Sequence, residues 1–400
     1  MSEVYVIDAV RTAVGKFGGT LSGVRPDDMA AHVIKALIER NRSVDFNNTD
    51  EVIFGAANQA GEDNRNVARM ALLLAGLSTE IPGYTVNRLC ASGLQSIMNG
   101  YMAIKSGTAE MLVVGGTESM SRAPFVMAKA ENAFQRNVEI YDTTIGWRFT
   151  NPALSALYHP YSMGETAENV AERYGITREA QDLFAYQSQL KWKQAQEAGK
   201  FSNEIVAYPI PGKKGAITLF DNDEHPRLSE VEVLANLKPA FRKDGSVTAG
   251  NSSGINDGAA ALLLASEATV KRYNLEPLAR IAGIGAAGVD PAVMGIGPVP
   301  ATRKALKHAG IALHDLSVAE LNEAFASQVL ASMNELQLNA EIVNPNGGSI
   351  AIGHPLGASG ARISTTLLHE MKRRNGSAKY GLATMCIGVG QGCAVVYEAC

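Results

Sequence analysis

The chain of 400 residues is poor in cysteine and has no large excess of either charge. Its four cysteines, at positions 90, 386, 393 and 400, lack the spacing of a zinc site and are too few for a disulfide scaffold. The formal net charge of −4 does not suggest a nucleic-acid or membrane-surface partner, and 46% hydrophobic residues exclude disorder. We therefore expect reduced thiols in a folded protein of two or three domains.

No apolar run is long enough to span a bilayer, and no signal peptide or transit leader precedes the strand-like segment at residues 4–10. These absences lead us to expect a soluble cytoplasmic protein that binds neither membranes nor nucleic acid. The 39 glycines are abundant by contrast, which is typical of an α/β protein with many tight turns.

One cysteine stands at a junction between two predicted elements. Cys90 follows the strand-like residues 84–86 and precedes a run with helical spacing, in which Leu94, Ile97, Met98 and Tyr101 share a face. A helix N-terminus favours a thiolate, so we expect a lowered pKa and a nucleophilic sulfur at this position. The alternative for a cysteine considered alone is an inert, buried thiol.

Changes in composition and in regularity of pattern along the chain predict two α/β parts separated by an insertion. Residues 122–250 are less regular than their flanks and include a long polar helix predicted from about Thr177 to Ala198. We divide the chain into a first half (1–121 plus 251–275), an inserted loop domain (122–250) and a second half (276–400).

The second half repeats features of the first. The tripeptide Ala91-Ser92-Gly93 recurs 267 positions later as Ala358-Ser359-Gly360, and Asn58 and Asn322 each follow a predicted strand. Each tripeptide precedes a predicted helix and then an apolar strand that ends in glycine. This order of elements indicates an internal duplication, in which the two tripeptides should face each other. The second copy has Gly357 where the first has Cys90, so only one half carries this thiol.

Three further segments place reactive groups at predicted strand ends. His354 lies between glycines just before a helix, Cys386 ends an apolar strand, and Asn322 follows another strand. Glycines after Cys386 expose backbone N–H groups, as an oxyanion site requires. Strand ends are where sites assemble in α/β proteins, so these groups together predict an active site.

The motifs that contain these residues resemble those of the thiolase family along nearly the whole chain. They are Asn87–Gly93, Gly115–Ser121, Asn251–Gly258, Asn322–Phe325, Gly353–Gly357 and Cys386–Gly392. The resemblance implies a five-layered α-β-α-β-α thiolase fold with two duplicated halves and an inserted loop lobe. Condensing ketosynthases share the fold but have a second histidine where this chain has Cys386.

The resemblance also implies roles for individual residues. Cys90 would carry the acyl group, His354 would take its proton, and Cys386 would act as acid and then base. Asn322 would hold a water beside the enolate, and the N–H groups of Cys90 and Gly388 would bind the tetrahedral oxyanion. No metal or cofactor is implied, because coenzyme A is a substrate.

Stretches outside the catalytic motifs resemble the bacterial branch of the family that cleaves 3-oxoadipyl-CoA to succinyl-CoA and acetyl-CoA in aromatic catabolism. They are residues 57–70, 119–127 and 144–149. The inserted domain would then contact coenzyme A, the substrate and other subunits of a homodimer or homotetramer. By family likeness, Ser253 would bind the pantetheine arm, and we expect Met163 and Phe325 to wall the acyl pocket. For all three residues, packing or turn formation is the alternative.

A dicarboxylic acyl chain needs a cation, because an unpaired buried carboxylate is costly. Arg148, between Trp147 and Phe149 in the insertion, is our candidate, and a solvated surface arginine is its alternative. Two other functions stay open. One is a general acetyl-CoA acetyltransferase or 3-ketoacyl-CoA thiolase with the same catalytic residues. The other is a non-catalytic protein that binds acyl-CoA, against which the intact set of Cys90, His354 and Cys386 argues.

Overall fold

Apolar strands buried on both faces form the centre of the computed structural model, which describes residues 2–400. In β5 (Met111–Ser119), Leu112 and Val114 face one core, whereas Met111 and Val113 face another. Side chains alternate between the faces of a strand, so a continuous apolar run predicts a strand that is covered on both sides.

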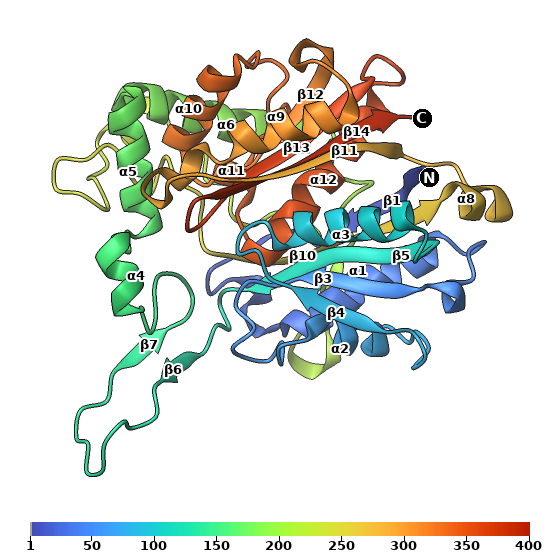
Figure 1. Ribbon diagram of the computed structural model, residues 1–400, viewed down its shortest axis with the longest axis horizontal. Coiled ribbons are helices and arrows are strands. Elements are labelled where there is room, and N and C mark those ends of the chain that lie inside the picture. Colours follow the sequence, from blue (N-terminus) through green and yellow to red (C-terminus); the bar gives the residue numbers. More distant parts are fainter. Residues whose placement is uncertain (1) are drawn as a thin grey trace.

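The strands join in the order β12-β13-β14-β11-β1-β10-β5-β3-β4, with β2 paired to β10 (Figure 1). Their bounds are β1 Val4–Arg11, β2 Gly15–Lys16, β3 Glu51–Gly55, β4 Gly83–Val86, β10 Asn256–Ser266, β11 Ala279–Gly288, β12 Leu316–Leu321, β13 Tyr380–Ile387 and β14 Gln391–Ala399. The sheets of the two halves join where β1 pairs with β11, at Tyr5–Arg280 and Val6–Ala279.

Helices complete five layers. α3 (Ser92–Ser106) and α12 (Leu356–Arg373) lie between the two halves of the sheet and share its central core (Figure 1). α1 (Pro26–Arg40) and α2 (Val67–Leu74) cover the outer face of the first half. α9 (Pro298–Ala309) and α10 (Ala326–Leu336) cover the outer face of the second. The predicted thiolase fold is confirmed in this layering.

Strand pairing repeats between the halves, as a duplicated α/β unit requires. β1–β10–β5 is antiparallel and β5–β3 is parallel, and β11–β14–β13 and β13–β12 repeat both relations. In the first half, β3 also has β4 as a parallel partner. The corresponding pairing in the second half is a single parallel bridge between Val343 and Ala319 of β12.

The two Ala-Ser-Gly turns face each other at the starts of α3 and α12, as the duplication predicts. A Cβ atom added to Gly93 would lie 2.7 Å from the carbonyl oxygen of Gly357, and one added to Gly360 would lie 2.2 Å from the Leu94 nitrogen. Glycine is therefore needed in both helices, because the two backbones approach more closely than any side chain allows.

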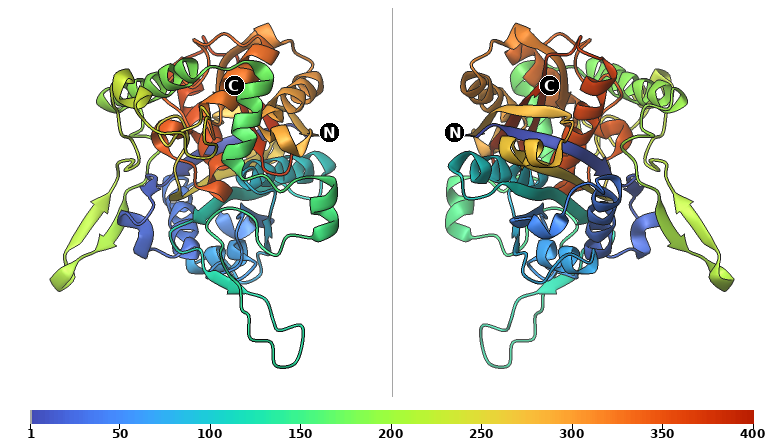
Figure 2. Two further views of the ribbon diagram at one scale, coloured as in Figure 1. Left: turned by 90° about the vertical axis from the view of Figure 1, so that its left-hand side faces the viewer. Right: turned by 90° about the vertical axis from the view of Figure 1, so that its right-hand side faces the viewer.

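The inserted segment extends from the body as two hairpins and a set of helices (Figure 2). One hairpin joins β6 (Phe125–Met127) to β7 (Ile140–Asp142), and the other joins β8 (Tyr208–Pro211) to β9 (Ile217–Phe220). The predicted polar helix is α6 (Arg178–Glu197), capped by the side chain of Thr177. The shorter helices of this segment are α4 Pro152–Leu157, α5 Met163–Tyr174 and α7 Val231–Ala235. Two further short helices, α8 Glu267–Tyr273 and α11 Ser349–Ile352, lie outside it.

Candidate active site

Side chains of the nucleophile loop hold Cys90 between β4 and α3. The Asn87 side chain accepts a hydrogen bond from the Leu89 N–H at 2.9 Å, and the Ser92 hydroxyl donates to the Leu89 carbonyl at 2.6 Å. Leu89 has a φ of 47°, in the left-handed region that a bulky residue seldom occupies. Strain of this kind persists where neighbours enforce it, and here it positions the next residue, Cys90.

The expected lowering of the Cys90 pKa is wrong for the resting protein. Burial raises the pKa of the Cys90 thiol to about 11, and the negative charge of Glu118 acts in the same direction. The backbone N–H groups of Gly388 and of Cys90 itself point at the sulfur and offset only part of this effect. Cys90 therefore rests as a thiol and needs a base to become a nucleophile.

His354 follows α11 and Gly353, whose φ of 114° is accessible to glycine. The imidazole is buried, with Nδ1 2.6 Å from the Ser359 hydroxyl and Nε2 3.4 Å from the Asn322 side-chain nitrogen. Burial lowers the pKa of His354 to about 3, with a smaller contribution from Arg362. The ring is therefore neutral near pH 7 and able to accept a proton.

Cys386 and Gly388 lie at the end of β13, beside the tight turn into β14. Cys386 is buried, and burial raises the pKa of its thiol, with a smaller contribution from Cys90. Val389 in the turn has a φ of 63°, a clear outlier for a β-branched residue. Strained residues thus flank both backbone N–H groups predicted for the oxyanion site, those of Cys90 and Gly388.

A cavity of about 240 Å³ opens at Cys90 and brings four of the predicted residues together. Cys90, Gly388, Met163 and Arg148 line it, and Leu356, which starts α12, closes one side. The cavity is mostly apolar apart from a few convergent polar groups, as expected for a small-molecule site.

Five predicted residues do not line this cavity: His354, Asn322, Cys386, Phe325 and Ser253. Phe325 is buried in an apolar cluster that includes Cys386 and Met163, with Phe241 against its ring at 6.2 Å, so core packing describes it better than a pocket wall. Ser253 is half-buried and donates its backbone N–H to the Ala324 carbonyl at 3.0 Å.

Glu118 is a cavity residue to which the sequence pattern assigned no role. It is buried at the end of β5, and its carboxylate accepts the backbone N–H groups of Ala57 and Gly357 at 2.8 Å and of Asn58 at 3.2 Å. Burial raises the pKa of Glu118 to about 7. This side chain joins the end of β5 to the loop after β3 and to the first turn of α12. Its place in the Gly115–Ser121 motif was the signal available in the sequence.

Asn58 attaches the outer wall of the cavity to the sheet. Its side-chain nitrogen donates to the Thr143 carbonyl at 3.2 Å and hydroxyl at 3.0 Å, and Thr143 begins the cavity-lining stretch 143–148. In the same stretch, the Trp147 indole donates to the Tyr161 carbonyl at 2.9 Å. These bonds hold the segment that carries Arg148.

Residues 2–400 contain neither a metal-binding group of side chains nor a helix suited to a membrane. No three His, Cys, Asp or Glu side chains in this part of the chain are grouped so as to hold a metal ion. None of its helices has the length and apolar character needed to cross a membrane.

Known proteins match the chain over its whole length. The thiolase N-terminal domain model matches residues 4–268 and the thiolase C-terminal domain model matches residues 275–399. The chain belongs to the thiolase family. A beta-ketoadipyl-CoA thiolase of Pseudomonas putida is 56% identical over all of both chains. A 3-oxoadipyl-CoA/3-oxo-5,6-dehydrosuberyl-CoA thiolase of Escherichia coli strain K12 is 54% identical, also over all of both. The crystal structure of a Bacillus anthracis acetyl-CoA acetyltransferase has a TM-score of 0.93 and 44% identity, and covers 100% of this chain and 99% of the other.

Proposed function

We propose that this protein cleaves 3-oxoadipyl-CoA with coenzyme A to give succinyl-CoA and acetyl-CoA. The observation that carries the proposal is the cavity in which a buried thiol, two oxyanion-type N–H groups and an arginine converge. The full-length similarity to thiolases named for this substrate supports it. Coenzyme A serves as the second substrate, and no other cofactor is needed.

The reaction begins when the Cys90 sulfur attacks the 3-keto carbon while His354 takes the thiol proton. The N–H groups of Cys90 and Gly388 stabilise the tetrahedral oxyanion, and each such donor is typically worth about 3 kcal/mol of barrier. The bond between C2 and C3 then breaks, leaving a succinyl thioester on Cys90 and the enolate of acetyl-CoA. Asn322 and His354 stabilise the enolate oxygen, Asn322 through a water.

Cys386 completes both halves of the reaction. Its thiol protonates C2 of the enolate, which releases acetyl-CoA and leaves Cys386 as a thiolate. That thiolate takes the proton of the incoming coenzyme A, whose sulfur attacks the succinyl thioester. Succinyl-CoA leaves, and the Cys90 thiolate regains its proton from His354, which restores the starting protonation states. Burial suits Cys386 to this role, because a raised pKa makes its thiolate a strong base.

Arg148 is the proposed partner of the distal carboxylate. It is half-buried in the cavity wall and has no carboxylate within ion-pair distance among residues 2–400. Glu118, the acid in the same wall, has its pKa raised to about 7 and its oxygens bonded to backbone N–H groups, which weakens its repulsion of a dicarboxylic substrate. An Arg–carboxylate pair is worth about 1.5–3 kcal/mol when charge-assisted hydrogen bonds form.

The test compares CoA-dependent thiolysis of 3-oxoadipyl-CoA, acetoacetyl-CoA and a neutral medium-chain 3-oxoacyl-CoA, with Cys90→Ser as the blank. We expect the highest kcat/KM for 3-oxoadipyl-CoA. Arg148→Ala should lower that value by about 10- to 100-fold and leave the neutral substrate nearly unchanged. Equal losses on both substrates would contradict the role of Arg148. Preference for acetoacetyl-CoA would favour a general acetyl-CoA acetyltransferase, as the Bacillus anthracis neighbour is named.

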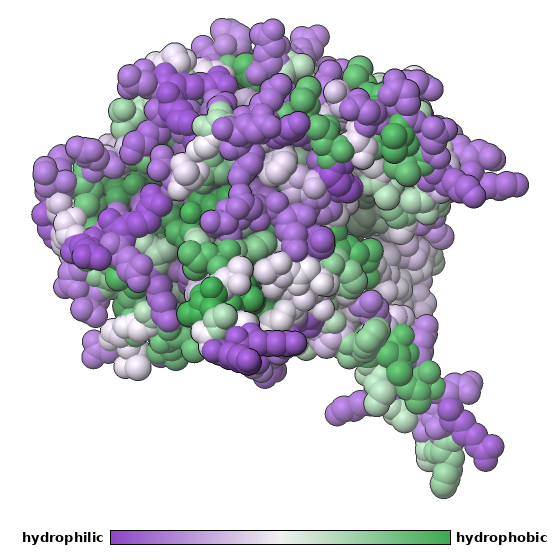
Figure 3. All heavy atoms as spheres, turned by 180° about the vertical axis from the view of Figure 1, so that it is seen from behind, coloured by the Kyte–Doolittle hydropathy of each residue, from purple (hydrophilic) through white to green (hydrophobic). Residues whose placement is uncertain are grey.

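We further propose that copies of the chain associate through the β6–β7 hairpin. Phe125, Met127 and Phe134 are 74%, 64% and 98% exposed, and the hairpin projects from the body with apolar side chains along it (Figure 3). Apolar side chains gathered on a projecting segment are typical of an interface. Light scattering should find a homodimer or homotetramer, and a variant with residues 128–137 replaced by a short Gly-Ser linker should be smaller.

A further inference from the structure

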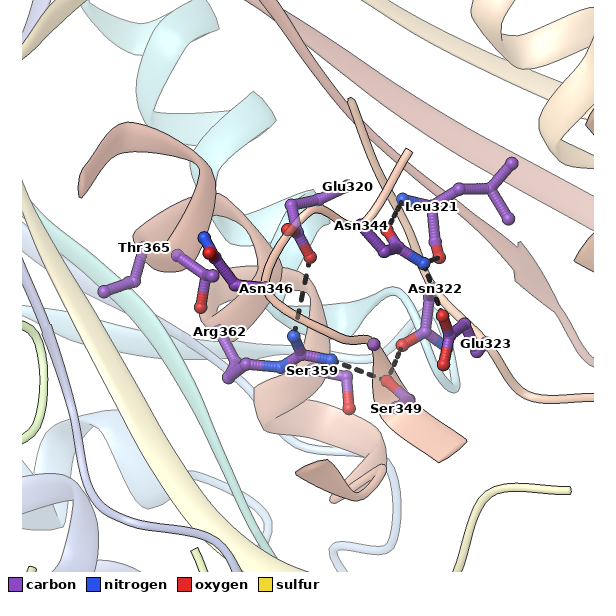
Figure 4. Close-up of polar contacts among 12 residues, drawn as sticks. Glu320, Leu321, Asn322, Glu323, Asn344, Asn346, Ser349, Ser359, Arg362 and Thr365 are labelled. Atoms are coloured by element: carbon purple, nitrogen blue, oxygen red, sulfur yellow. Dashed lines mark hydrogen bonds and ion pairs between the residues drawn. The ribbon is translucent and has the colours of Figure 1, made fainter. Parts of the chain in front are cut away.

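A chain of buried polar groups extends from His354 away from the cavity. It runs through Asn322, Ser349 and Arg362 to Glu320, and neither these residues nor His354 itself line the cavity (Figure 4). The backbone just before Asn322 is also held, because the Asn344 side chain bonds both the N–H and the carbonyl of Leu321, at 2.8 and 2.9 Å. Asn322 is therefore fixed in both its main chain and its side chain.

The direction of each hydrogen bond follows from Arg362. A guanidinium only donates, so its Nη2 donates to the Ser349 hydroxyl at 2.6 Å. The Ser349 hydroxyl must then donate its own proton to Asn322 Oδ1, 2.5 Å away. With Oδ1 facing Ser349, the side-chain amide of Asn322 turns its NH₂ group toward His354 Nε2, at 3.4 Å. Nε2 is thereby an acceptor and carries no proton.

The other ring nitrogen gives the same result independently. The Ser359 hydroxyl donates to the Pro355 carbonyl at 2.8 Å, so it has no proton left for His354. Nδ1 of His354 must therefore donate to Ser359, over 2.6 Å. Two unconnected sets of contacts thus require the same tautomer, with the proton on Nδ1 and the lone pair on Nε2.

Burying Arg362 at this position costs free energy, because its charged group loses its contacts with water. It is 2% exposed, and within residues 2–400 its Nε and Nη1 have no hydrogen-bond partner. Its nearest carboxylate, that of Glu320, lies 3.7 Å from Nη1, and Glu320 Oε1 is also without a partner in this part of the chain. A buried ion pair with such incomplete hydrogen bonding contributes little to stability, so stability does not explain why Arg362 is buried here.

We propose that Arg362, acting through Ser349 and Asn322, is a positioning residue that fixes His354 as the Nδ1–H tautomer and so keeps Nε2 ready to accept the proton of Cys90. The proposal rests on the proposed function of His354 as the base. A neutral hydroxyl or amide in place of the guanidinium could reverse every bond in the chain, whereas arginine cannot, because it has no acceptor atom and stays charged.

The test removes the middle of the chain and leaves the ion pair in place. Ser349→Ala should free the Asn322 amide to rotate, so that its oxygen faces Nε2 and favours a proton there. Nitrogen-15 spectra of histidine-labelled protein, with His354 assigned by its loss in His354→Asn, should then show Nε2–H signal absent from the wild type. The rate of Cys90 alkylation by iodoacetamide should fall at least about tenfold, the loss typical when a hydrogen-bond partner that orients a functional histidine is removed.

Three further variants distinguish positioning from a general structural effect. Ser349→Thr keeps the hydroxyl and should keep the wild-type tautomer and most of the alkylation rate, and Arg362→Lys, which still only donates, should retain the tautomer. Thr365→Val removes another buried hydroxyl, one that bonds only the Ala361 carbonyl, and should change neither readout. An unchanged tautomer and unchanged alkylation in folded Ser349→Ala would overturn the proposal. Both readouts are made without substrate, so a wrong choice of acyl-CoA would leave them unaffected.

Discussion

The two Ala-Ser-Gly turns at the centre of the molecule are alike in sequence and packing but differ in the residue before them. In the first half that residue is Cys90, whose thiol opens into the cavity. In the second half it is Gly357, where a Cβ would lie 2.7 Å from Ala56 Cα and 2.8 Å from the Glu118 carboxylate. The second copy cannot carry a side chain at this point, because the loops of the first copy occupy the space.

Asn58 and Asn322 show the same divergence. Both follow the equivalent strands β3 and β12, yet Asn58 binds Thr143 in the cavity wall, whereas Asn322 faces His354. In the proposed mechanism, one half therefore supplies the nucleophile and the wall of the acyl site, and the other supplies the base and its supporting chain. Duplication places the two sets at one point, because the starts of α3 and α12 meet there.

The largest expected effect separates the two asparagines. Asn322→Ala should lower kcat of thiolysis by about 10²–10³, the cost typical of losing one oxyanion donor. Asn58→Ala should leave kcat nearly unchanged and raise KM about fivefold, since it loses wall contacts worth about 1 kcal/mol. Steady-state kinetics on 3-oxoadipyl-CoA gives both numbers. Similar kcat losses in the two variants would show that the halves are not specialised in this way.

A smaller effect tests the packing that brings the halves together. Gly93→Ala and Gly360→Ala should each destabilise the protein by about 1–3 kcal/mol, because the new methyl group meets backbone atoms that cannot move aside. Gly23→Ala is the control, since its Cβ would have no neighbour within 4 Å and its φ is not left-handed. Thermal unfolding should show a lower Tm for the first two variants alone. An unchanged Tm in both would mean that the helices can separate at little cost.

Much of the fold and the reactive residues could be predicted from local patterns. Apolar runs marked strands such as β5 and β13, and glycine-bordered motifs marked Cys90, His354 and Cys386. The order of elements also revealed the duplication. These signals are contained within short stretches of sequence, so no knowledge of tertiary contacts was required.

Other features depend on contacts between distant segments and left no local signal. The thiol pKa of Cys90 was predicted in the wrong direction, because burial by several loops outweighs the start of α3. Asn58 meets Thr143 across 85 positions, and Glu118 meets Gly357 across 239. The bond from Arg362 to Ser349 likewise exists only after α12 has packed beneath α11.

The last expected effect is the pH dependence of stability that His354 of the second half contributes. His354 has a pKa of about 3 when folded and an ordinary value near 6.5 when unfolded. Between these values the unfolded chain binds the extra proton, so this residue's contribution to stability is present above pH 6.5 and is lost as the pH falls. The loss is at most about 1.4 kcal/mol per pH unit, or about 2 kcal/mol at pH 5.

His354→Asn removes that proton site and keeps a neutral polar side chain. The unfolding free energy of the wild type, less that of the variant, should therefore be about 2 kcal/mol smaller at pH 5 than at pH 7. His32, His225 and His369, whose pKa values burial also lowers, are present in both proteins and cancel in this difference. A difference that did not vary with pH would mean that folding leaves the pKa of His354 unchanged, so burial would not be what keeps the ring neutral. A difference that grew as the pH fell would mean that His354 is protonated in the folded protein. It could not then accept the proton of Cys90, and the proposed separation of roles between the halves would fail at its central step.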